Sequence, residues 1–193
     1  AINGNFDDCQ NLVKAMFADK PFSSSINMSG VNSINWARII AQSVYYFYSF
    51  FLIKDGSQPI NFSVPTGNFG DVYAGYLAKK MGLPINKLVV ATNQNDILHR
   101  AISKGEYNVE KVSETISPSM DIQLASNFER LLFDVNNCDD IETASAMKDI
   151  KEKGKYIIDK KKLEKINVDF LSARVSEEEV LKTIKSVYGE FKS

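Results

Sequence analysis

The fold of this chain is decided by the stretch Ser63-Val64-Pro65-Thr66-Gly67-Asn68-Phe69-Gly70-Asp71. An alternating apolar segment at residues 60–64 leads into a turn with two glycines, and residues 72–81 then have helical composition. A helix that begins directly after such a loop leaves backbone N–H groups without partners, and these groups can bind an anion such as a phosphate. We expect Gly67 and Gly70 to let the main chain turn sharply and approach that anion closely. The loop is neither a Walker A motif nor GxGxxG, so by itself it also suits an ordinary strand-to-helix connection.

A second strand is predicted at residues 87–92, where Leu88-Val89-Val90-Ala91 is an apolar run typical of a strand inside a parallel sheet. Strand, helix and strand in this spacing indicate a βαβ unit. Ligands of such sheets bind at the carboxyl ends of the strands. The loop at residues 66–71 and the polar loop at residues 92–96 are both predicted at this edge, the latter before a helix at residues 97–104.

Another helix start is predicted around residues 32–38. Asn32, Ser33 and Asn35 are candidate caps of a helix that runs to about residue 52 and is apolar on nearly every side. Polar residues interrupt it too often for a membrane span, so we expect a buried core helix. Arg38 falls in its first turn, where a cation opposes the helix dipole unless an anion offsets it. The residues allow a second anion site here, although a surface arginine beside an ordinary cap is the simpler interpretation.

The composition excludes several classes of function. Lys and Arg number 23 against 24 Asp and Glu, so no bulk field favours nucleic acid or an anionic membrane. Cys9 and Cys138 are far apart, which predicts neither a disulfide framework nor a metal site and favours a reducing cytoplasm. The single histidine, His99, has no evident serine or cysteine partner, which argues against a hydrolytic triad. We also predict no catalytic carboxylate pair.

The remaining elements follow from local signals. The start of the chain has no initiator Met and no secretory signal, and it looks like a piece of a longer protein. Capping-box spacing predicts a helix from Ser126 to about Phe133 and another after Ser176. The other segments are expected as a strand end (residues 1–5), a helix (7–18), a loop (19–28), a helix (143–153), a solvated lysine-rich segment (155–165) and a strand (170–174).

Several of these motifs together resemble one family. The run from Pro65 to Asp71, followed by Ala74-Gly75 and by Ala91-Thr92-Asn93-Gln94-Asn95-Asp96, is similar to threonine synthases, which are pyridoxal-phosphate enzymes of the tryptophan-synthase-β fold type. Supporting segments occur in the same order: residues 4–10, Asn32-Ser33-Ile34-Asn35 with Arg38 and Gln42, residues 117–121, and Ser126-Asn127-Phe128-Glu129-Arg130. The match is close to about residue 133 and looser from about 134. It implies a three-layer α/β fold with a mostly parallel sheet, as in fold-type II pyridoxal-phosphate enzymes.

The resemblance implies a reaction and two anion sites. Threonine synthases convert O-phospho-L-homoserine and water into L-threonine and phosphate, the last step of threonine biosynthesis, with pyridoxal 5'-phosphate as cofactor. By resemblance, the cofactor phosphate is bound by the backbone amides of Gly67, Asn68, Phe69 and Gly70 and by the Asn68 side chain. The positions that match the substrate-phosphate site are Asn32, Ser33, Asn35 and Arg38.

One departure from the family pattern limits these expectations. The Schiff-base lysine of the family lies in a Ser-Phe-Lys-Asp type of segment, and residues 1–193 contain none. We therefore expect no catalytic residue in this chain, which would be most of the large cofactor-binding domain and would need the remainder of the same polypeptide for turnover. Two alternatives stay open: a related pyridoxal-phosphate lyase acting on another amino acid, and a non-catalytic domain that binds phosphate-bearing metabolites.

Overall fold

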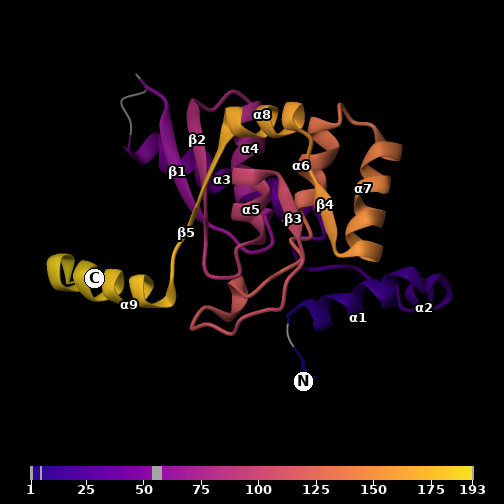
Figure 1. Ribbon diagram of the computed structural model, residues 1–193. Coiled ribbons are helices and arrows are strands. Elements are labelled where there is room, and N and C mark those ends of the chain that lie inside the picture. Colours follow the sequence, from indigo (N-terminus) through magenta and orange to yellow (C-terminus); the bar gives the residue numbers. More distant parts are fainter. Residues whose placement is uncertain (1, 5, 54–57, 193) are drawn as a thin grey trace.

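A three-stranded parallel sheet forms the centre of the chain (Figure 1). The computed structural model describes residues 2–4, 6–53 and 58–192. The sheet contains β1 (Ile60–Pro65), β2 (Ile85–Thr92) and β5 (Phe170–Arg174) in the order β1-β2-β5. The three strands at residues 60–64, 87–92 and 170–174 were all expected from the sequence, and the predicted α/β fold with a parallel sheet is confirmed.

The connection between β1 and β2 is the predicted βαβ unit. Helix α4 (Gly70–Lys80) joins the two strands and ends before Gly82, whose φ of +103° lies in the left-handed region. The parallel ladder extends past both strand ends, because the Thr66 amide donates to the Ala91 carbonyl at 2.8 Å and the Val175 amide donates to the Thr92 carbonyl at 3.0 Å. The loops that follow the three strands therefore leave from the same edge of the sheet.

The remaining elements surround this sheet. A 3-10 turn lies at Pro118–Met120, and the short strands β3 (Glu106–Asn108) and β4 (Lys155–Ile157) pair antiparallel. The other helices are α1 (Phe6–Ala18), α2 (Lys20–Ser25), α3 (Trp36–Ile53), α5 (Ile97–Lys104), α6 (Phe128–Val135), α7 (Asp140–Lys153), α8 (Lys160–Asp169) and α9 (Glu177–Phe191). In Figure 1, α1 and α2 lie below α6 and α7, and α9 extends away from the body on the opposite side.

Helix α3 packs closely along α4. A Cβ on Gly75 would lie 2.5 Å from the Tyr46 ring and 2.9 Å from Leu88, so only glycine permits this approach. The Tyr46 hydroxyl donates to the Asp71 carbonyl at 2.9 Å. Burial raises the pKa of Tyr46 well above its ordinary value of 10, which keeps this donor protonated. A buried hydroxyl thus fixes α3 against the first turn of α4.

The expectation of a buried core helix is correct for only one face of α3. One face is buried, through Ile39, Ser43, Tyr46 and Phe50, and Phe47 is half-buried against the core. The remaining large apolar side chains of α3 are 44–73% exposed. Apolar composition does not say which side of a helix meets a neighbour, and here α4 covers a single face. In the part of the chain that the structure describes, no helix is long and apolar enough to cross a membrane.

Three further local expectations are corrected by the structure. Helix α2 lies in the predicted loop because the Asp19 side chain accepts from the Phe22 amide at 3.1 Å, a cap that the serine-rich composition obscured. Helix α8 lies in the predicted solvated segment, capped in the same way by Asp159, and it buries Ile166. The strand expected at residues 1–5 is absent at residues 2–4, and residues 1 and 5 fall outside the described part.

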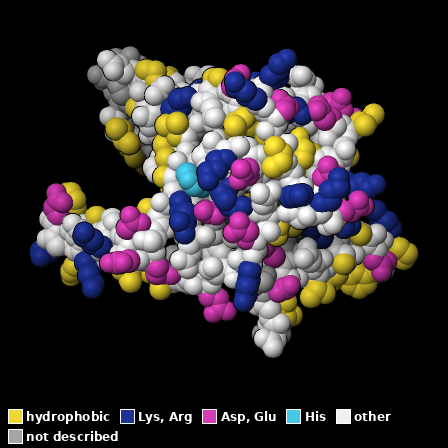
Figure 2. All heavy atoms as spheres, in the orientation of Figure 1, with side chains coloured by type: hydrophobic (Ala, Val, Ile, Leu, Met, Phe, Trp, Pro, Cys, Tyr) yellow, Lys and Arg dark blue, Asp and Glu magenta, His cyan; other side chains and the backbone are white. Residues whose placement is uncertain are grey.

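The two predicted capping boxes had different outcomes. At α9 the box is present, because the Ser176 hydroxyl accepts from the Glu179 amide and the Glu179 carboxylate accepts from the Ser176 amide. At α6 it is absent: the helix begins at Phe128, and Asn127 occupies the N-cap position without a side-chain cap bond. The large apolar side chains Ile184, Val187, Tyr188 and Phe191 of α9 are exposed. Figure 2 shows both charged and hydrophobic side chains on this helix.

The close contact between α3 and α4 gives a testable prediction. Replacing Gly75 by alanine should lower the free energy of unfolding by about 1–3 kcal/mol, because the added methyl group overlaps the Tyr46 ring. Chemical denaturation measures the change. The matched control is Gly189→Ala in α9, where a Cβ meets nothing within 4 Å and alanine should be neutral or stabilising by up to about 1 kcal/mol. Equal stabilities of the two variants would contradict this packing.

Candidate functional site

The loop between β1 and α4 is shaped by a residue that is not glycine. Phe69 has φ +68° in the left-handed region, which ordinary side chains avoid, and its side chain is completely buried. Its ring contacts Phe128 edge to face at 5.3 Å and lies 5.5 Å from the Phe170 ring. Neither Gly67 nor Gly70 has a positive φ, so the turn at this loop does not depend on a glycine in the left-handed region.

The two glycines are required by space instead. A Cβ on Gly67 would lie 3.2 Å from the Ser119 carbonyl oxygen and from Met120 Cα. A Cβ on Gly70 would lie 3.1 Å from Ser33 Cβ and 3.0 Å from Asn68 Oδ1. The absence of a side chain at Gly67 thus lets the 3-10 turn pack against this loop. The absence of one at Gly70 lets the loop that precedes α3 pack there. These glycines allow three chain segments to meet at the start of α4.

The segment at residues 32–38 forms the second loop of the site. The Asn35 side chain accepts from the Ala37 amide at 3.0 Å and donates to the Gly30 carbonyl at 2.9 Å, and α3 begins at Trp36. Asn32 accepts from the Ile34 amide at 3.0 Å within the turn. Of the three candidate caps, Asn35 is therefore the one that caps α3. Arg38 lies in the first turn of α3 with an exposed side chain.

The two loops meet at Ser33. Its buried hydroxyl oxygen accepts from the side-chain amide of Asn68 and from that of Asn127, each at 3.1 Å. Asn68 also accepts from the Gly70 amide at 2.8 Å, which closes the first turn of α4. The structure therefore brings Ser33 together with Gly67, Asn68, Phe69 and Gly70, although the two segments are about 35 residues apart in the sequence.

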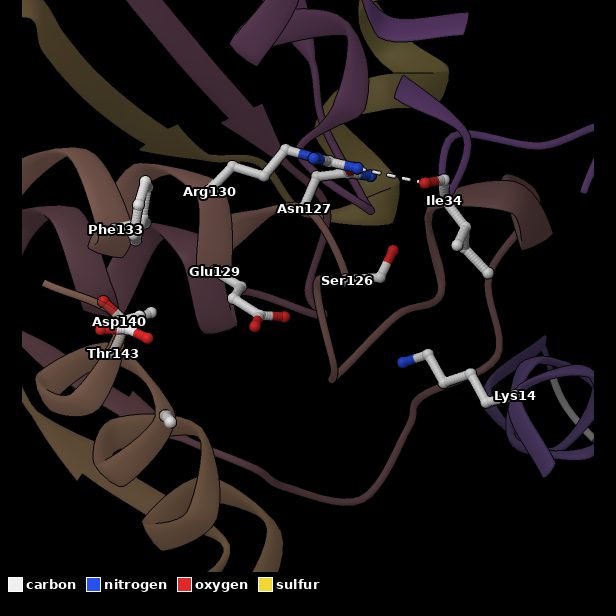
Figure 3. Close-up of a pocket in the computed structure, with 10 residues that line it drawn as sticks. Lys14, Ile34, Ser126, Asn127, Glu129, Arg130, Phe133, Asp140 and Thr143 are labelled. Carbon is white, nitrogen blue, oxygen red and sulfur yellow. Dashed lines mark hydrogen bonds between the residues drawn. The ribbon is translucent and has the colours of Figure 1, made fainter. Parts of the chain in front are cut away.

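Asn127 and Arg130 belong to this site and were not predicted as functional. Asn127 is 1% exposed, and its backbone amide donates to the Asn68 carbonyl at 3.1 Å. Arg130 donates to Asn127 Oδ1 at 3.0 Å and to the Ile34 carbonyl at 3.1 Å (Figure 3). The sequence signal is the run Ser126-Asn127-Phe128-Glu129-Arg130, whose spacing predicts only a helix cap.

A cavity of about 410 Å³ opens beside this junction. Figure 3 shows Lys14 of α1, Ser126 and Glu129 around it, with Asp140 and Thr143 of α7 on the far side. Its wall combines two cationic with two acidic side chains, counting Arg130, so the cavity has no dominant charge. Its lining does not by itself indicate a particular ligand.

Helix α1 closes this region through two long-range contacts. Gln10 donates to the Ser126 hydroxyl at 3.5 Å, and Asp7 Oδ2 accepts from the Gln123 amide at 3.3 Å. The other carboxylate oxygen of Asp7 is buried without a partner among the described residues. Burial raises the pKa of Asp7, and the hydrogen bond from Gln123 offsets only part of this increase.

The loop after β2 is held by a buried polar cluster. Asp121 Oδ1 accepts from Asn93 at 2.8 Å and from Asn95 at 2.9 Å, and its Oδ2 accepts from the Thr115 amide at 2.8 Å. The Thr115 hydroxyl adds a further bond to Oδ1 at 2.7 Å. A buried carboxylate with all of these donors is well compensated, so the cluster fixes the loop at residues 113–121 to the carboxyl edge of the sheet.

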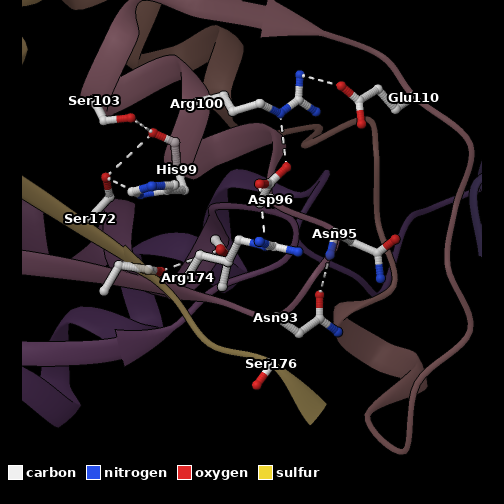
Figure 4. Close-up of polar contacts among 12 residues, drawn as sticks. Asn93, Asn95, Asp96, His99, Arg100, Ser103, Glu110, Ser172, Arg174 and Ser176 are labelled. Atoms are coloured by element: carbon white, nitrogen blue, oxygen red, sulfur yellow. Dashed lines mark hydrogen bonds and ion pairs between the residues drawn. The ribbon is translucent and has the colours of Figure 1, made fainter. Parts of the chain in front are cut away.

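Beside this cluster, α5 is tied to β5 (Figure 4). Nδ1 of His99 lies 3.0 Å from the Ser172 hydroxyl, so the expectation that His99 has no serine partner is wrong. Arg100 donates to Asp96 at 2.8 Å, and Arg174 of β5 pairs with the same carboxylate at 3.4 Å. The His99 contact joins a helix to a strand, and it belongs to this structural network.

No group of three or more His, Cys, Asp or Glu side chains that could hold a metal ion occurs among the described residues. Cys9 and Cys138 are exposed free thiols.

Known threonine synthases are similar to this chain in sequence and structure. No protein-family model matches the chain. The curated threonine synthases of Saccharomyces cerevisiae and Pseudomonas aeruginosa are 50% and 48% identical to it, over 97% of this chain and over 39% and 40% of their own lengths. The chain thus spans about two fifths of the length of these relatives.

Solved structures give the same result. The crystal structure of a PLP-bound threonine synthase from Brucella melitensis matches 100% of this chain and 42% of its own, with a TM-score of 0.90 and 49% identity. The yeast threonine synthase matches 96% of this chain and 38% of its own, with a TM-score of 0.82 and 49% identity. The α/β fold with a parallel sheet is that of fold-type II pyridoxal-phosphate enzymes. Across nearly its whole length, the chain is similar to part of known threonine synthases.

The raised pKa of Asp7 predicts a pH dependence of stability. A carboxyl group whose pKa is higher in the folded state than in the unfolded state contributes stability below its unfolded pKa of about 3.9, and this is lost as the pH rises through the folded pKa. Asp7→Asn does not titrate. Its stability relative to the native protein should therefore increase between pH 3 and pH 6 in chemical denaturation.

Asp159→Asn is the matched control for this experiment. Asp159 caps α8, and the hydrogen bond from the Lys162 amide lowers its pKa. Its contribution is present above the unfolded pKa and is lost as the pH falls, so the stability of the Asp159→Asn variant relative to the native protein should decrease over the same range. The prediction for Asp7 is wrong if both variants change in the same direction.

Proposed function

We propose that this chain is the phosphate-binding part of a threonine synthase. The whole enzyme would convert O-phospho-L-homoserine and water into L-threonine and phosphate with pyridoxal 5'-phosphate as cofactor. The observation that carries the proposal is the junction at Ser33, which joins the two family motifs with phosphate-binding character into one site. Similarity to threonine synthases over 97% of the chain supports it.

The loop between β1 and α4 fits the phosphate of the cofactor. Helix α4 has eleven residues, and the N–H groups of its first turn have no acceptors within the helix. The Gly70 amide donates to Asn68 Oδ1 at 2.8 Å in this structure, so it would have to share its hydrogen with the phosphate. Gly67 and Gly70 carry no side chain that could cover the approach to these groups. The Asn68 amide group has two N–H donors, of which Ser33 takes one, so the second remains for the phosphate. We assign cofactor binding to Gly67, Asn68, Phe69 and Gly70, with Phe69 contributing its backbone amide alone.

The loop before α3 fits the phosphate of the substrate. Arg38 in the first turn of α3 is exposed, and an anion bound there would offset the unfavourable position of its charge near a helix N-terminus. The Ser33 hydroxyl and the side chains of Asn32 and Asn35 complete our assignment. When bound, pyridoxal phosphate would act as the electron sink of the reaction, and this chain's residues would bind and orient the two phosphates.

The remainder of the same polypeptide is proposed to supply the Schiff-base lysine. Residues 1–193 contain no Ser-Phe-Lys-Asp type of segment, and we propose that they form most of the large cofactor-binding domain. We expect the isolated chain to be inactive. The two exposed free cysteines support a reducing cytoplasmic location, and the balanced charge supports small-molecule over nucleic-acid partners.

The activity of the complete protein tests this proposal. Purified protein with pyridoxal phosphate should release phosphate and L-threonine from O-phospho-L-homoserine in equal amounts. Activity on another phosphorylated amino acid alone would instead favour the related lyase. Binding of phosphate-bearing metabolites without turnover would favour the non-catalytic domain.

Arg38→Ala tests the substrate-phosphate loop in the complete protein. Loss of a charge-assisted contact with the substrate phosphate should raise KM for O-phospho-L-homoserine by about 10- to 100-fold, with an unchanged affinity for pyridoxal phosphate. Lys182→Ala removes one exposed positive charge from α9 and should leave KM unchanged. A native KM in the Arg38 variant would exclude this arginine from the substrate site.

A further inference from the structure

The orientation of the Asn127 side chain is determined by its neighbours. Arg130 is a donor without acceptor capacity, so the atom of Asn127 that faces its Nε at 3.0 Å must be the amide oxygen. The NH₂ group of Asn127 then faces the other way, toward Ser33 Oγ at 3.1 Å and the Asn68 carbonyl at 3.2 Å. Both of its N–H donors are used at the junction of the two loops.

Arg130 is itself fixed to the loop before α3. Its terminal nitrogen donates to the Ile34 carbonyl, and its guanidinium lies 5.1 Å from the centre of the Trp36 ring. Figure 3 shows the guanidinium of Arg130 between Asn127 and Ile34. The orientation of Asn127 is therefore linked to the position of this loop on one side and to Asn68 on the other.

The two amide groups determine the orientation of the Ser33 hydroxyl group. A serine hydroxyl has two acceptor lone pairs and one donor hydrogen. Asn68 and Asn127 occupy both lone pairs, each at 3.1 Å. The hydroxyl hydrogen of Ser33 is then the only polar atom of this side chain that remains available to bind an anion. It cannot point toward Asn68 or Asn127, because both present N–H donors to the Ser33 oxygen.

We propose that Asn127, oriented by Arg130, is a positioning residue that fixes the Ser33 hydroxyl as a donor to the substrate phosphate and couples the two phosphate loops. This inference rests on the proposed function, which assigns the substrate phosphate to Ser33. Asn127 contacts neither phosphate itself. It acts through Ser33 on one loop and through the Asn68 carbonyl on the other.

Phosphate binding by the complete protein tests the role of Asn127. With pyridoxal phosphate loaded, inorganic phosphate is the probe, and calorimetry measures its dissociation constant. Asn127→Ala and Ser33→Ala should each weaken phosphate binding by about tenfold, and the double variant should be no weaker than either single variant. Additive losses would overturn the proposal, because Asn127 would then not act through Ser33.

Asn127→Asp keeps the shape of the side chain, and it covers the case in which Asn127→Ala does not fold. Its carboxylate can only accept, so it would draw the Ser33 hydrogen away from the phosphate and weaken binding at least tenfold. Native phosphate affinity in this variant overturns the proposal.

The matched control is Asn136→Ala at the other end of α6. Asn136 is also buried and donates to the Thr143 hydroxyl at 3.0 Å, away from both loops. It should lower the thermal unfolding temperature without changing phosphate affinity. Equal phosphate affinities of the Asn127→Ala and Asn136→Ala variants would show that Asn127 has only a structural role.

Hydrogen exchange of the protein without cofactor provides an independent measurement. Asn127→Ala should accelerate exchange in residues 31–36 and in residues 66–71, whereas Asn136→Ala should accelerate neither. Unchanged exchange in either segment overturns the coupling. If the native protein makes no threonine, the proposed function fails, and phosphate affinity and exchange still decide the role of Asn127.

Discussion

The candidate site depends on the packing of the Phe69 ring in the core. Its backbone is left-handed, which costs about 1–2 kcal/mol for a residue with a side chain. Full burial of a phenylalanine side chain contributes about 1.5–3 kcal/mol, which offsets that cost. The ring packs against Phe128 of α6 and Phe170 of β5, so the shape of a tight loop is set by segments that lie much later in the sequence. The start of α4 is therefore held in place by the core.

Around this apolar anchor, polar contacts link the loops to one another. Ser33, Asn68 and Asn127 are connected by hydrogen bonds of 3.1–3.2 Å, and Arg130 extends the network to Ile34. Buried polar groups that hydrogen-bond to one another keep one arrangement, because any other would break these bonds. Rigidity of this kind suits the proposed binding of two phosphates at a fixed separation.

A second polar network stabilises the neighbouring loops at the carboxyl edge of the sheet. Asp121 accepts hydrogen bonds from Asn93, Asn95 and Thr115. The Asp96 carboxylate forms ion pairs with both Arg100 and Arg174. These contacts keep the loop after β2 beside the end of β5. Side-chain hydrogen bonds and ion pairs therefore hold the loops at the sheet edge where the candidate site lies.

The sequence by itself determined the elements with strong local signals. The βαβ unit, the three strands of the parallel sheet and the capped helix α9 followed from periodicity and from end signals that act within a few residues. The family motifs placed both loops of the candidate site. The sequence did not predict α2 and α8. Each begins at a single capping aspartate, and the serine-rich or lysine-rich composition around it favours a loop or a solvated segment.

Only the tertiary structure decided what each side chain does. The left-handed conformation of Phe69, the spatial need for Gly67 and Gly70, and the single buried face of α3 all depend on neighbours distant in sequence. The same holds for Asn127, whose spacing indicated a helix cap although its amide joins two loops. Local patterns specify where a chain turns or coils, whereas the partner of a buried polar group is known only when the chain has folded around it.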